Sequence, residues 1–112
     1  MTSARQAKDG AYETAMRELA QIGCFCRGTV LRRHMACGKP GCRCQADPPA
    51  LHGPYYQWTR KVRGKTVTVR VTESQARLLR GWIAEGRRFY VLAARLERLS
   101  AANIARELRP KT

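Results

Sequence analysis

The strongest constraint on the fold is a cluster of cysteines in the first half of the chain. All five cysteines of this 112-residue chain lie between positions 24 and 44. An odd number fits a disulfide framework poorly, and thiols stay reduced inside the cell. The first residues lack the apolar segment of a secretory signal, and no apolar run approaches the roughly 18 residues of a membrane span. We therefore expect a cytoplasmic protein, not associated with membranes, whose cysteines hold a metal ion.

The spacing Cys37-Gly-Lys-Pro-Gly-Cys42-Arg-Cys44 predicts a zinc site. Its Pro-Gly pair suits the central positions of a type II turn, which would bring the first two cysteines together. The last two cysteines, two positions apart, would point their sulfurs to the same side of an extended segment. Tetrahedral zinc needs a fourth ligand, for which His52 is the first choice and His34, Cys24 and Cys26 are alternatives. The predicted ligands are Cys37, Cys42, Cys44 and His52.

Hydrophobic periodicity predicts the regular elements on either side of the cysteine-rich loop. Residues 10–22 have helical spacing with Tyr12, Met16 and Leu19 on one face, and residues 28–35 suit a strand. Residues 55–62 and 65–71 flank Arg63-Gly64, a two-residue hairpin turn. We expect an α+β fold with a short N-terminal helix, a small three-stranded antiparallel sheet carrying the zinc loop, and a long C-terminal helix.

A capping box predicts where the C-terminal helix begins. Thr72 suits the N-cap position and Gln75 can reach back to its amide. The helix would run to about Leu108, before Pro110, with a bend or break near Gly81 and Gly86. We therefore expect a single domain made of a helical segment (1–26), a zinc-loop and sheet module (27–72) and a helix packing on the sheet (73–109).

The charge of the chain points to a polyanionic partner. The net charge is +14, and residues 27–72 contain ten Lys and Arg with Asp47 as their only carboxylate. Clustered cations of this kind are typical of a nucleic-acid-binding surface. The hairpin alternation predicts a polar face through which nucleic acid would bind, whereas stacking of Tyr55 on an unpaired base would favour RNA or single strands. The predicted nucleic-acid-binding residues are Arg32, Arg33, Tyr55, Gln57, Arg60, Lys61, Arg63, Lys65 and Arg70.

The same sequence argues against catalysis and leaves one alternative open. With one carboxylate between Ala20 and Thr72, a two-metal nuclease or a carboxylate-pair hydrolase lacks its functional groups. We therefore expect a binding protein and not an enzyme. The alternative is a zinc-stabilised adaptor that binds a protein partner, or forms a homodimer, through a stripe on the C-terminal helix. The stripe, which could also pack on the N-terminal helix, comprises Phe89, Leu92, Leu96 and Leu99.

Two motifs carry a resemblance to a known family. The Cys37–Cys44 motif and His52-Gly-Pro-Tyr55, preceded by Arg27-Gly28 and Arg32-Arg33, resemble a prokaryotic family of small uncharacterised, zinc-finger-like proteins with a domain of unknown function. The resemblance supports the three motif cysteines and His52 as one set. It weakens His34, where the family usually has an aromatic residue, and leaves Cys24 and Cys26 outside the pattern. The strand-strand-strand-helix order is also similar to domains of some recombinases that lay a sheet in a DNA groove, which favours DNA over RNA.

Overall fold

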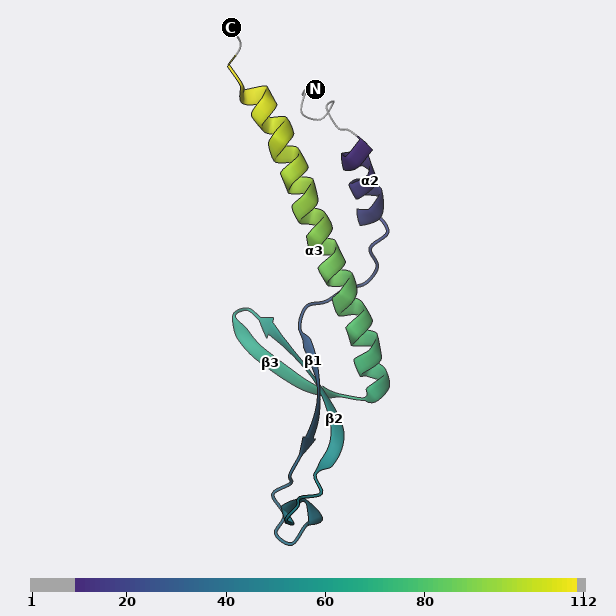
Figure 1. Cartoon of the computed structure of the whole chain (residues 1–112), viewed down its shortest axis with the longest axis vertical. Helices are drawn as coiled ribbons and strands as arrows, with labels where there is room; N and C mark the ends of the chain where they lie inside the picture. The colour runs from purple at the N-terminus through teal and green to yellow at the C-terminus, as the bar shows by residue number, and fades with distance from the viewer. Residues whose placement is uncertain (1–9, 111–112) are drawn as a thin grey trace. The chain divides into compact units, whose positions relative to one another are not determined.

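The computed structural model describes residues 10–110 and confirms the α+β fold (Figure 1). A three-stranded antiparallel sheet in the order β1-β2-β3 lies between two helices in the sequence. The chain divides into two compact units, which are Phe25–Ala84 and the described parts of Met1–Cys24 with Glu85–Thr112. The elements are α2 (Gly10–Leu19), β1 (Thr29–Met35), the 3-10 turn η1 (Arg43–Gln45), β2 (His52–Val62), β3 (Lys65–Val71) and α3 (Glu73–Leu108).

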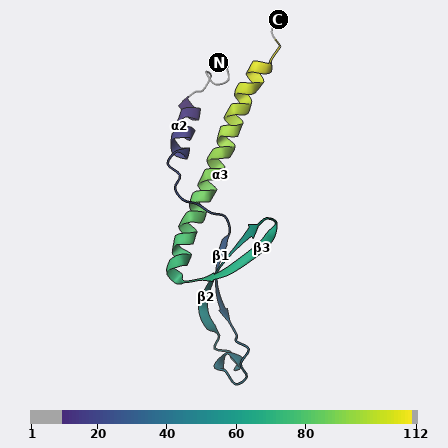
Figure 2. The same ribbon diagram turned by 180° about the vertical axis from the view of Figure 1, so that it is seen from behind.

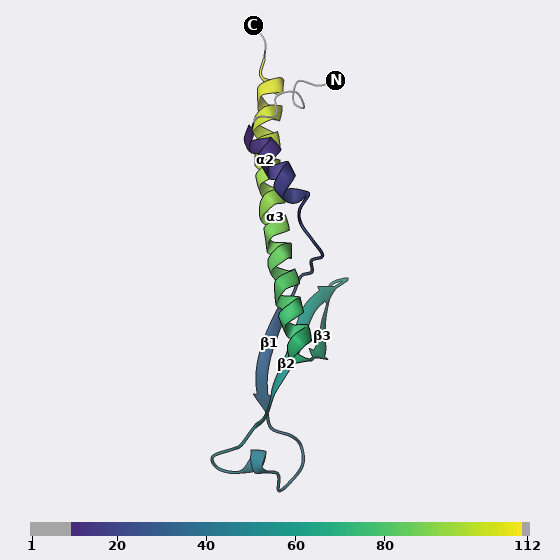
Figure 3. The same ribbon diagram turned by 90° about the vertical axis from the view of Figure 1, so that its right-hand side faces the viewer.

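The second strand, β2, begins three residues earlier than predicted. β2 starts at His52, and Met35 of β1 pairs with this residue after an irregularity in register. The Arg63-Gly64 turn is confirmed, with φ of 52° and 81° at the two residues, as a type I′ hairpin turn requires. The cysteine-rich loop therefore lies at the end of the sheet opposite this turn (Figure 3).

The register assigns each side chain to one of two faces, because directly opposed residues in antiparallel strands share a face. Arg33 pairs with Tyr55 and Arg32 with Tyr56, so the two arginines lie on opposite faces. The polar face comprises Thr29, Leu31, Arg33, Tyr55, Gln57, Thr59, Lys61, Thr66, Thr68 and Arg70. The apolar face comprises Val30, Arg32, Tyr56, Trp58, Arg60, Val62, Lys65, Val67, Val69 and Val71.

The first turns of α3 supply the core of the sheet unit. β3 leads directly into α3 (Figure 2), which brings the helix back to the apolar face. Tyr56 of this face is buried, as are three residues of the helix, and the Arg80 guanidinium lies 5.9 Å from the centre of the Tyr56 ring. The buried helical residues are Ala76, Leu79 and Ile83. The helix covers part of the apolar face, where Tyr56 is buried and Val62 and Val69 stay exposed, and the polar face forms surface.

The predicted capping box is present at the start of α3. The backbone amide of Gln75 donates to Thr72 Oγ1 at 3.1 Å, and the backbone amide of Thr72 donates to the side-chain Oε1 of Gln75 at 2.8 Å. Of the bend or break predicted near Gly81 and Gly86, the break is wrong, because α3 continues through both residues. The helix-favouring residues around each glycine offset its cost of about 1 kcal/mol. Neither helix within residues 10–110 is long and apolar enough to cross a membrane.

We expect Gly81→Ala to stabilise the protein by about 0.5–1 kcal/mol, since alanine loses less backbone entropy in a helix than glycine. A Cβ atom at this position would meet no atom within 4 Å. Chemical denaturation of the metal-loaded variant and wild type measures the change. A loss of stability would show that Gly81 is needed for something other than helix formation.

The second unit contains α2 and the C-terminal part of α3 (Figure 1). Ala15 and Leu92 are buried, and the other members of the predicted leucine-rich stripe are half-buried. Met16, which the sequence pattern places on the packed face of α2, is 41% exposed. The helix ends at Leu19, before the predicted residue 22. The Gly23 amide donates to Glu85 Oε2 at 2.7 Å and lowers the pKa of this carboxyl group.

Candidate metal centre

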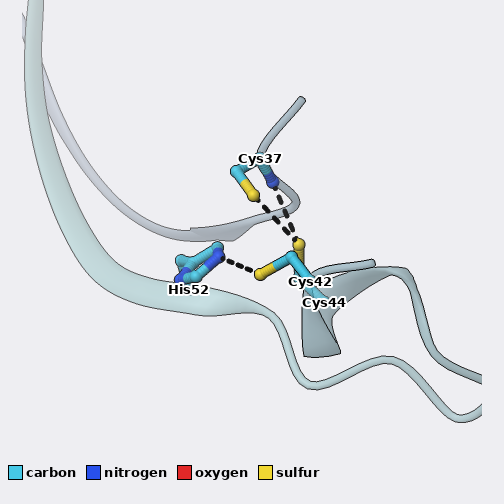
Figure 4. Close-up of side chains that lie close together, drawn as sticks. All are labelled: Cys37, Cys42, Cys44 and His52. Carbon is cyan, nitrogen blue, oxygen red and sulfur yellow. Dashed lines mark hydrogen bonds between the residues drawn. The ribbon is translucent and has the colours of Figure 1, made fainter. Parts of the chain in front are cut away.

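Four side chains converge at the end of the sheet (Figure 4). Their potential ligand atoms all lie within 4.8 Å of one another. Cys37 follows β1, Cys42 and Cys44 flank Arg43 in the loop, and His52 is the first residue of β2. Cys44 is 2% exposed and the other three are half-buried. Three thiols and one imidazole at this separation could hold a metal ion.

Two consecutive turns fold the loop around these residues. The Cys42 amide lies 3.4 Å from the Lys39 carbonyl and Gly41 has φ of 79°, as expected for the predicted type II turn. The 3-10 turn η1 follows, with the Gln45 amide donating to the Cys42 carbonyl at 2.8 Å. The prediction of an extended segment from Cys42 to Cys44 is therefore wrong. The sulfurs converge because the chain turns sharply between the two cysteines.

Hydrogen bonds among the four residues place their sulfurs and nitrogen in pairs (Figure 4). The Sγ atoms of Cys37 and Cys44 lie 3.4 Å apart, and Cys42 Sγ lies 3.1 Å from His52 Nε2. The Cys37 amide donates to Cys44 Sγ at 3.2 Å. A backbone amide aimed at sulfur favours the thiolate, which is the form that binds metal.

The thiols differ in acidity because their surroundings differ. The Cys44 amide, followed by hydrogen bonds from the side chains of Cys44, Cys37 and His52, lowers the pKa of Cys42 to about 6. The Cys37 amide acts in the same direction on Cys44. Burial and the neighbouring Cys37 and Cys42 thiols outweigh it, so the pKa of Cys44 is raised. At neutral pH without a metal ion, Cys42 is the thiolate of this pair and Cys44 retains its proton.

Gln45 supports the cluster and was not predicted from the sequence. Its Nε2 donates to the Cys37 carbonyl at 2.6 Å and lies 3.8 Å from Cys44 Sγ. The side chain thus ties the start of the loop to the 3-10 turn. Its position directly after the last cysteine of the motif is the only sequence feature that could have suggested this role.

Gly53 allows the histidine to lie close to β1. The residue has φ of 135°, and a Cβ atom would stand 2.8 Å from the Arg33 carbonyl oxygen and 3.2 Å from the Cα of His34. Real side chains do not tolerate such contacts, so only glycine permits the two strands to approach here. The glycine after His52 is therefore part of what holds the histidine at the cluster.

The alternative ligands suggested by the sequence lie outside this cluster. His34 is exposed in β1, Cys24 is exposed, and Cys26 is half-buried. The Cys26 amide donates to the Trp82 carbonyl at 3.2 Å, which ties the segment before β1 to α3. Among residues 10–110, the four predicted ligands are thus the ones that come together.

The structure separates the predicted nucleic-acid-binding residues into groups. Arg33, Tyr55, Gln57, Lys61 and Arg70 share the polar face. The Arg70 guanidinium lies 4.2 Å from the centre of the Tyr55 ring, so the two side chains stack. The remaining residues lie elsewhere: Arg63 is in the hairpin turn, and Arg32, Arg60 and Lys65 are on the apolar face.

Arg60 was predicted to contact phosphate, but its guanidinium is packed against the protein. Its guanidinium stacks on Trp58 at 4.0 Å from the ring centre, and Nη1 is buried without a hydrogen-bond partner. Trp58 is itself fixed, because its Nε1 donates to the Arg27 carbonyl at 3.0 Å. The alternation of β2 places Arg60 among apolar residues, where it packs through its planar group.

Comparison with known proteins places the chain in a family. Residues 6–80 match the family described as Domain of unknown function (DUF6788). The chain belongs to this family. The DUF6788 match includes the four clustered residues, all three strands and the first turns of α3. No curated protein and no solved structure matches the chain.

Proposed function

We propose that this DUF6788 protein is a zinc-stabilised protein that binds nucleic acid, DNA in preference to RNA, through the polar face of its sheet. The observation that carries the proposal is the chemistry of this face. Arg33, Lys61 and Arg70 are exposed on it beside three exposed threonines, and no carboxylate belongs to it. Across Phe25–Ala84, twelve Lys and Arg accompany only Asp47 and Glu73.

The donor set supports zinc as the metal. Three cysteine thiolates and one histidine form a common closed structural zinc site, whereas hard cations such as magnesium prefer oxygen ligands. In a tetrahedron with zinc–sulfur bonds of about 2.3 Å, the ligand atoms are about 3.8 Å apart. The ligand atoms here lie within 4.8 Å of one another, so shifts of about 1 Å would complete the site. With all four positions taken by protein, the ion would stabilise the loop and leave no position for a substrate.

The polar face offers both phosphate contacts and base contacts. Lysine, arginine and threonine side chains donate to phosphate oxygens and provide affinity without sequence preference. Gln57 and Arg70 pair directly across β2 and β3, so their side chains lie next to each other. Glutamine suits adenine and arginine suits guanine in the major groove, which admits a two-stranded β-ribbon. The pair is therefore our candidate for reading base edges.

The Tyr55–Arg70 stack favours duplex DNA over unpaired bases. One face of the Tyr55 ring is covered by the guanidinium, so that face cannot stack on a base. Stacking orients the guanidinium and leaves its N–H groups at the edges for bidentate hydrogen bonds. Recognition of unpaired bases relies on open aromatic faces, whereas groove recognition relies on oriented donors. The Arg70 guanidinium, held by its stack on Tyr55, is an oriented donor of the kind that groove recognition uses.

Two double variants test the proposal, because the register places an exposed arginine of β1 and an exposed lysine next to the hairpin turn on each face. Arg33→Gln with Lys61→Gln removes two charges from the polar face, and Arg32→Gln with Lys65→Gln removes two from the apolar face. We expect the polar-face variant to weaken DNA binding by about tenfold or more. It should also lower the salt slope by about 1.8, or 0.9 per lost phosphate contact.

Fluorescence anisotropy with labelled duplex DNA, single-stranded DNA and RNA across a salt series measures both quantities. The apolar-face variant should bind within about twofold of wild type, since a distant exposed charge is screened at physiological salt. Equal losses in the two variants would contradict the assignment to one face. Tighter binding to RNA than to duplex DNA would overturn the preference for DNA.

A second candidate function follows from exposed apolar residues on α3. Ile104 and Leu108, one turn apart, are 49% and 77% exposed, and Val91 is 59% exposed. These residues suit an adaptor or a homodimer that associates through the C-terminal helix. If zinc-loaded wild type binds none of the three nucleic acids, this candidate replaces the first. Sedimentation equilibrium of wild type and Leu108→Ser then distinguishes a dimer from a monomer with a different partner.

A further inference from the structure

A pocket of about 370 Å³ opens beside β2 near the hairpin turn. β1 begins at Thr29, opposite Thr59, so the last residues of β2, from Arg60 to Val62, have no partner in β1. The pocket lies where a longer first strand would continue. Its donor-bearing side chains come from the segment before β1, from β1 itself and from both strands of the hairpin: Arg27, Thr29, Thr59, Arg60, Lys61 and Thr66.

A glycine and a tryptophan fix the wall of this pocket. Gly28 has φ of 125°, and a Cβ atom there would stand 2.5 Å from both the Thr59 carbonyl oxygen and Trp58 Nε1. The absence of a side chain lets the chain pass directly against β2. The Trp58 indole then donates to the Arg27 carbonyl at 3.0 Å and holds Arg27 at the rim. The pocket is therefore formed by backbone that is held in place before any ligand arrives.

The lining has the composition of a phosphate site. Arg27 and Lys61 bring positive charge and multiple N–H donors, and the threonines bring hydroxyl groups that donate to phosphate oxygens. Arg60 also lines the pocket, and its guanidinium is stacked on Trp58. No carboxylate lines the pocket to repel an anion. Thr59 Oγ1 shares a 2.8 Å hydrogen bond with Thr68 Oγ1, which orients this hydroxyl.

The size of the pocket favours more than a bare phosphate group. Its volume is at the lower end of the roughly 300–1,000 Å³ of ligand pockets, enough for a phosphate with its attached sugar. The threonines and Lys61 belong to the polar face, so the pocket opens onto the surface proposed to bind DNA. We propose that this pocket binds one sugar-phosphate unit of a polynucleotide backbone and so fixes the register of the strand on the polar face.

This inference rests on the proposed function but is tested separately from it. The probes are the dinucleotide thymidylyl-(3′→5′)-thymidine, which has one internal phosphodiester, and thymidine 5′-monophosphate, which has a terminal phosphate. Each is titrated into the zinc-loaded, ¹⁵N-labelled full chain while the amide resonances are followed. We expect the dinucleotide to shift the amides of Thr29, Thr59 and Thr66 in a saturable manner. The amide spectrum also reports whether each variant is folded.

Lys61→Gln and Lys65→Gln form a matched pair, because both lysines are exposed near the hairpin turn but lie on opposite faces. We expect Lys61→Gln to weaken dinucleotide binding about tenfold, as loss of a charged hydrogen bond implies, and Lys65→Gln to change it by less than about twofold. Thr66→Val, which removes a hydroxyl at nearly constant volume, should weaken binding without altering charge. If thymidine 5′-monophosphate bound more strongly than the dinucleotide, the ligand of the pocket would be a free nucleotide, and the proposal that it is part of a polynucleotide backbone would be overturned.

The outcomes separate this inference from the proposed function. Wild type that binds duplex DNA, but whose Thr29, Thr59 and Thr66 amides do not shift with the dinucleotide, overturns the pocket and leaves the proposed binding of DNA by the polar face standing. Saturable dinucleotide shifts without duplex binding support the pocket and overturn the proposed function. Absence of both overturns both.

Discussion

Replacing Cys44 by serine is expected to abolish stable metal binding. Cys44 is the most buried of the four clustered residues, and its sulfur receives the Cys37 amide and lies 3.4 Å from the Cys37 sulfur. A serine hydroxyl is a poor zinc ligand, and three remaining ligands leave a structural site open. After dialysis against a chelator of moderate strength, wild type should retain about one equivalent of zinc and the variant less than about a tenth.

Loss of the ion should release the loop from Cys37 to His52. Cys44 is the only buried residue in this segment, so little apolar packing remains to order it. Hydrogen exchange of the loop amides should therefore rise strongly in the variant and in chelated wild type, while β2–β3 amides stay protected.

Metal affinity should also fall as the pH is lowered. The raised pKa of Cys44 means that this thiol carries a proton which the metal must displace.

Cys24→Ser is the matched control, because Cys24 is exposed and lies outside the cluster. It should retain metal as wild type does. Full retention of zinc by Cys44→Ser, or loss of zinc from Cys24→Ser, would show that the ligand set differs from the four residues brought together here.

Gly28→Ala is expected to destabilise the sheet unit by about 2–6 kcal/mol. Non-glycine residues with strained backbone angles cost roughly 1–3 kcal/mol, and an overpacked contact costs about as much again. The new Cβ would stand 2.5 Å from the Thr59 carbonyl oxygen, which cannot move without disturbing the pairing of β1 with β2. Urea denaturation of the zinc-loaded protein, followed by tryptophan fluorescence, measures the loss.

Gly64→Ala separates the two contributions. Gly64 also has a positive φ, of 81°, but a Cβ atom there meets nothing within 4 Å. The Gly64→Ala variant should therefore lose only the stability that comes from backbone strain, about 1 kcal/mol. If both variants lost the same amount, the close approach of Gly28 to β2 would contribute nothing to stability, and the rigid wall of the pocket would lose its basis.

Features encoded by neighbouring residues could be predicted from the sequence. Thr72 and Gln75 form a capping box through contacts three residues apart, and Arg63-Gly64 forms a turn from its own backbone preferences. The clustered cysteines followed from the same kind of local spacing. In each case the interacting groups are separated by a few residues, so composition and spacing carry the information.

The faces of the hairpin could be predicted from its alternation, but features that depend on how β1 pairs with β2 could not. The sequence does not decide which of Arg32 and Arg33 joins the polar face, because a shift of one residue exchanges them. The register with Tyr55 and Tyr56 decides it. Arg60 is a different case: the alternation of β2 already places it on the apolar face, and grouping it with the phosphate contacts followed its charge instead. The approach of Gly28 to Trp58 likewise joins residues 30 positions apart, and no local pattern marks it.

The uninterrupted length of β2 has a consequence for how the two ends of the sheet communicate. Its eleven residues span roughly 36 Å, from His52 in the metal centre to Val62 at the hairpin turn. β1 pairs with β2 from Thr59 to His52. A ligand that binds both strands at one end of this pair therefore also restricts a shift of their register at the other end. Two ligands that both require the same register are thermodynamically linked, and each raises the affinity for the other by the same factor. With the ligands proposed here, bound zinc would raise the affinity for DNA, and bound DNA would raise the affinity for zinc by the same factor.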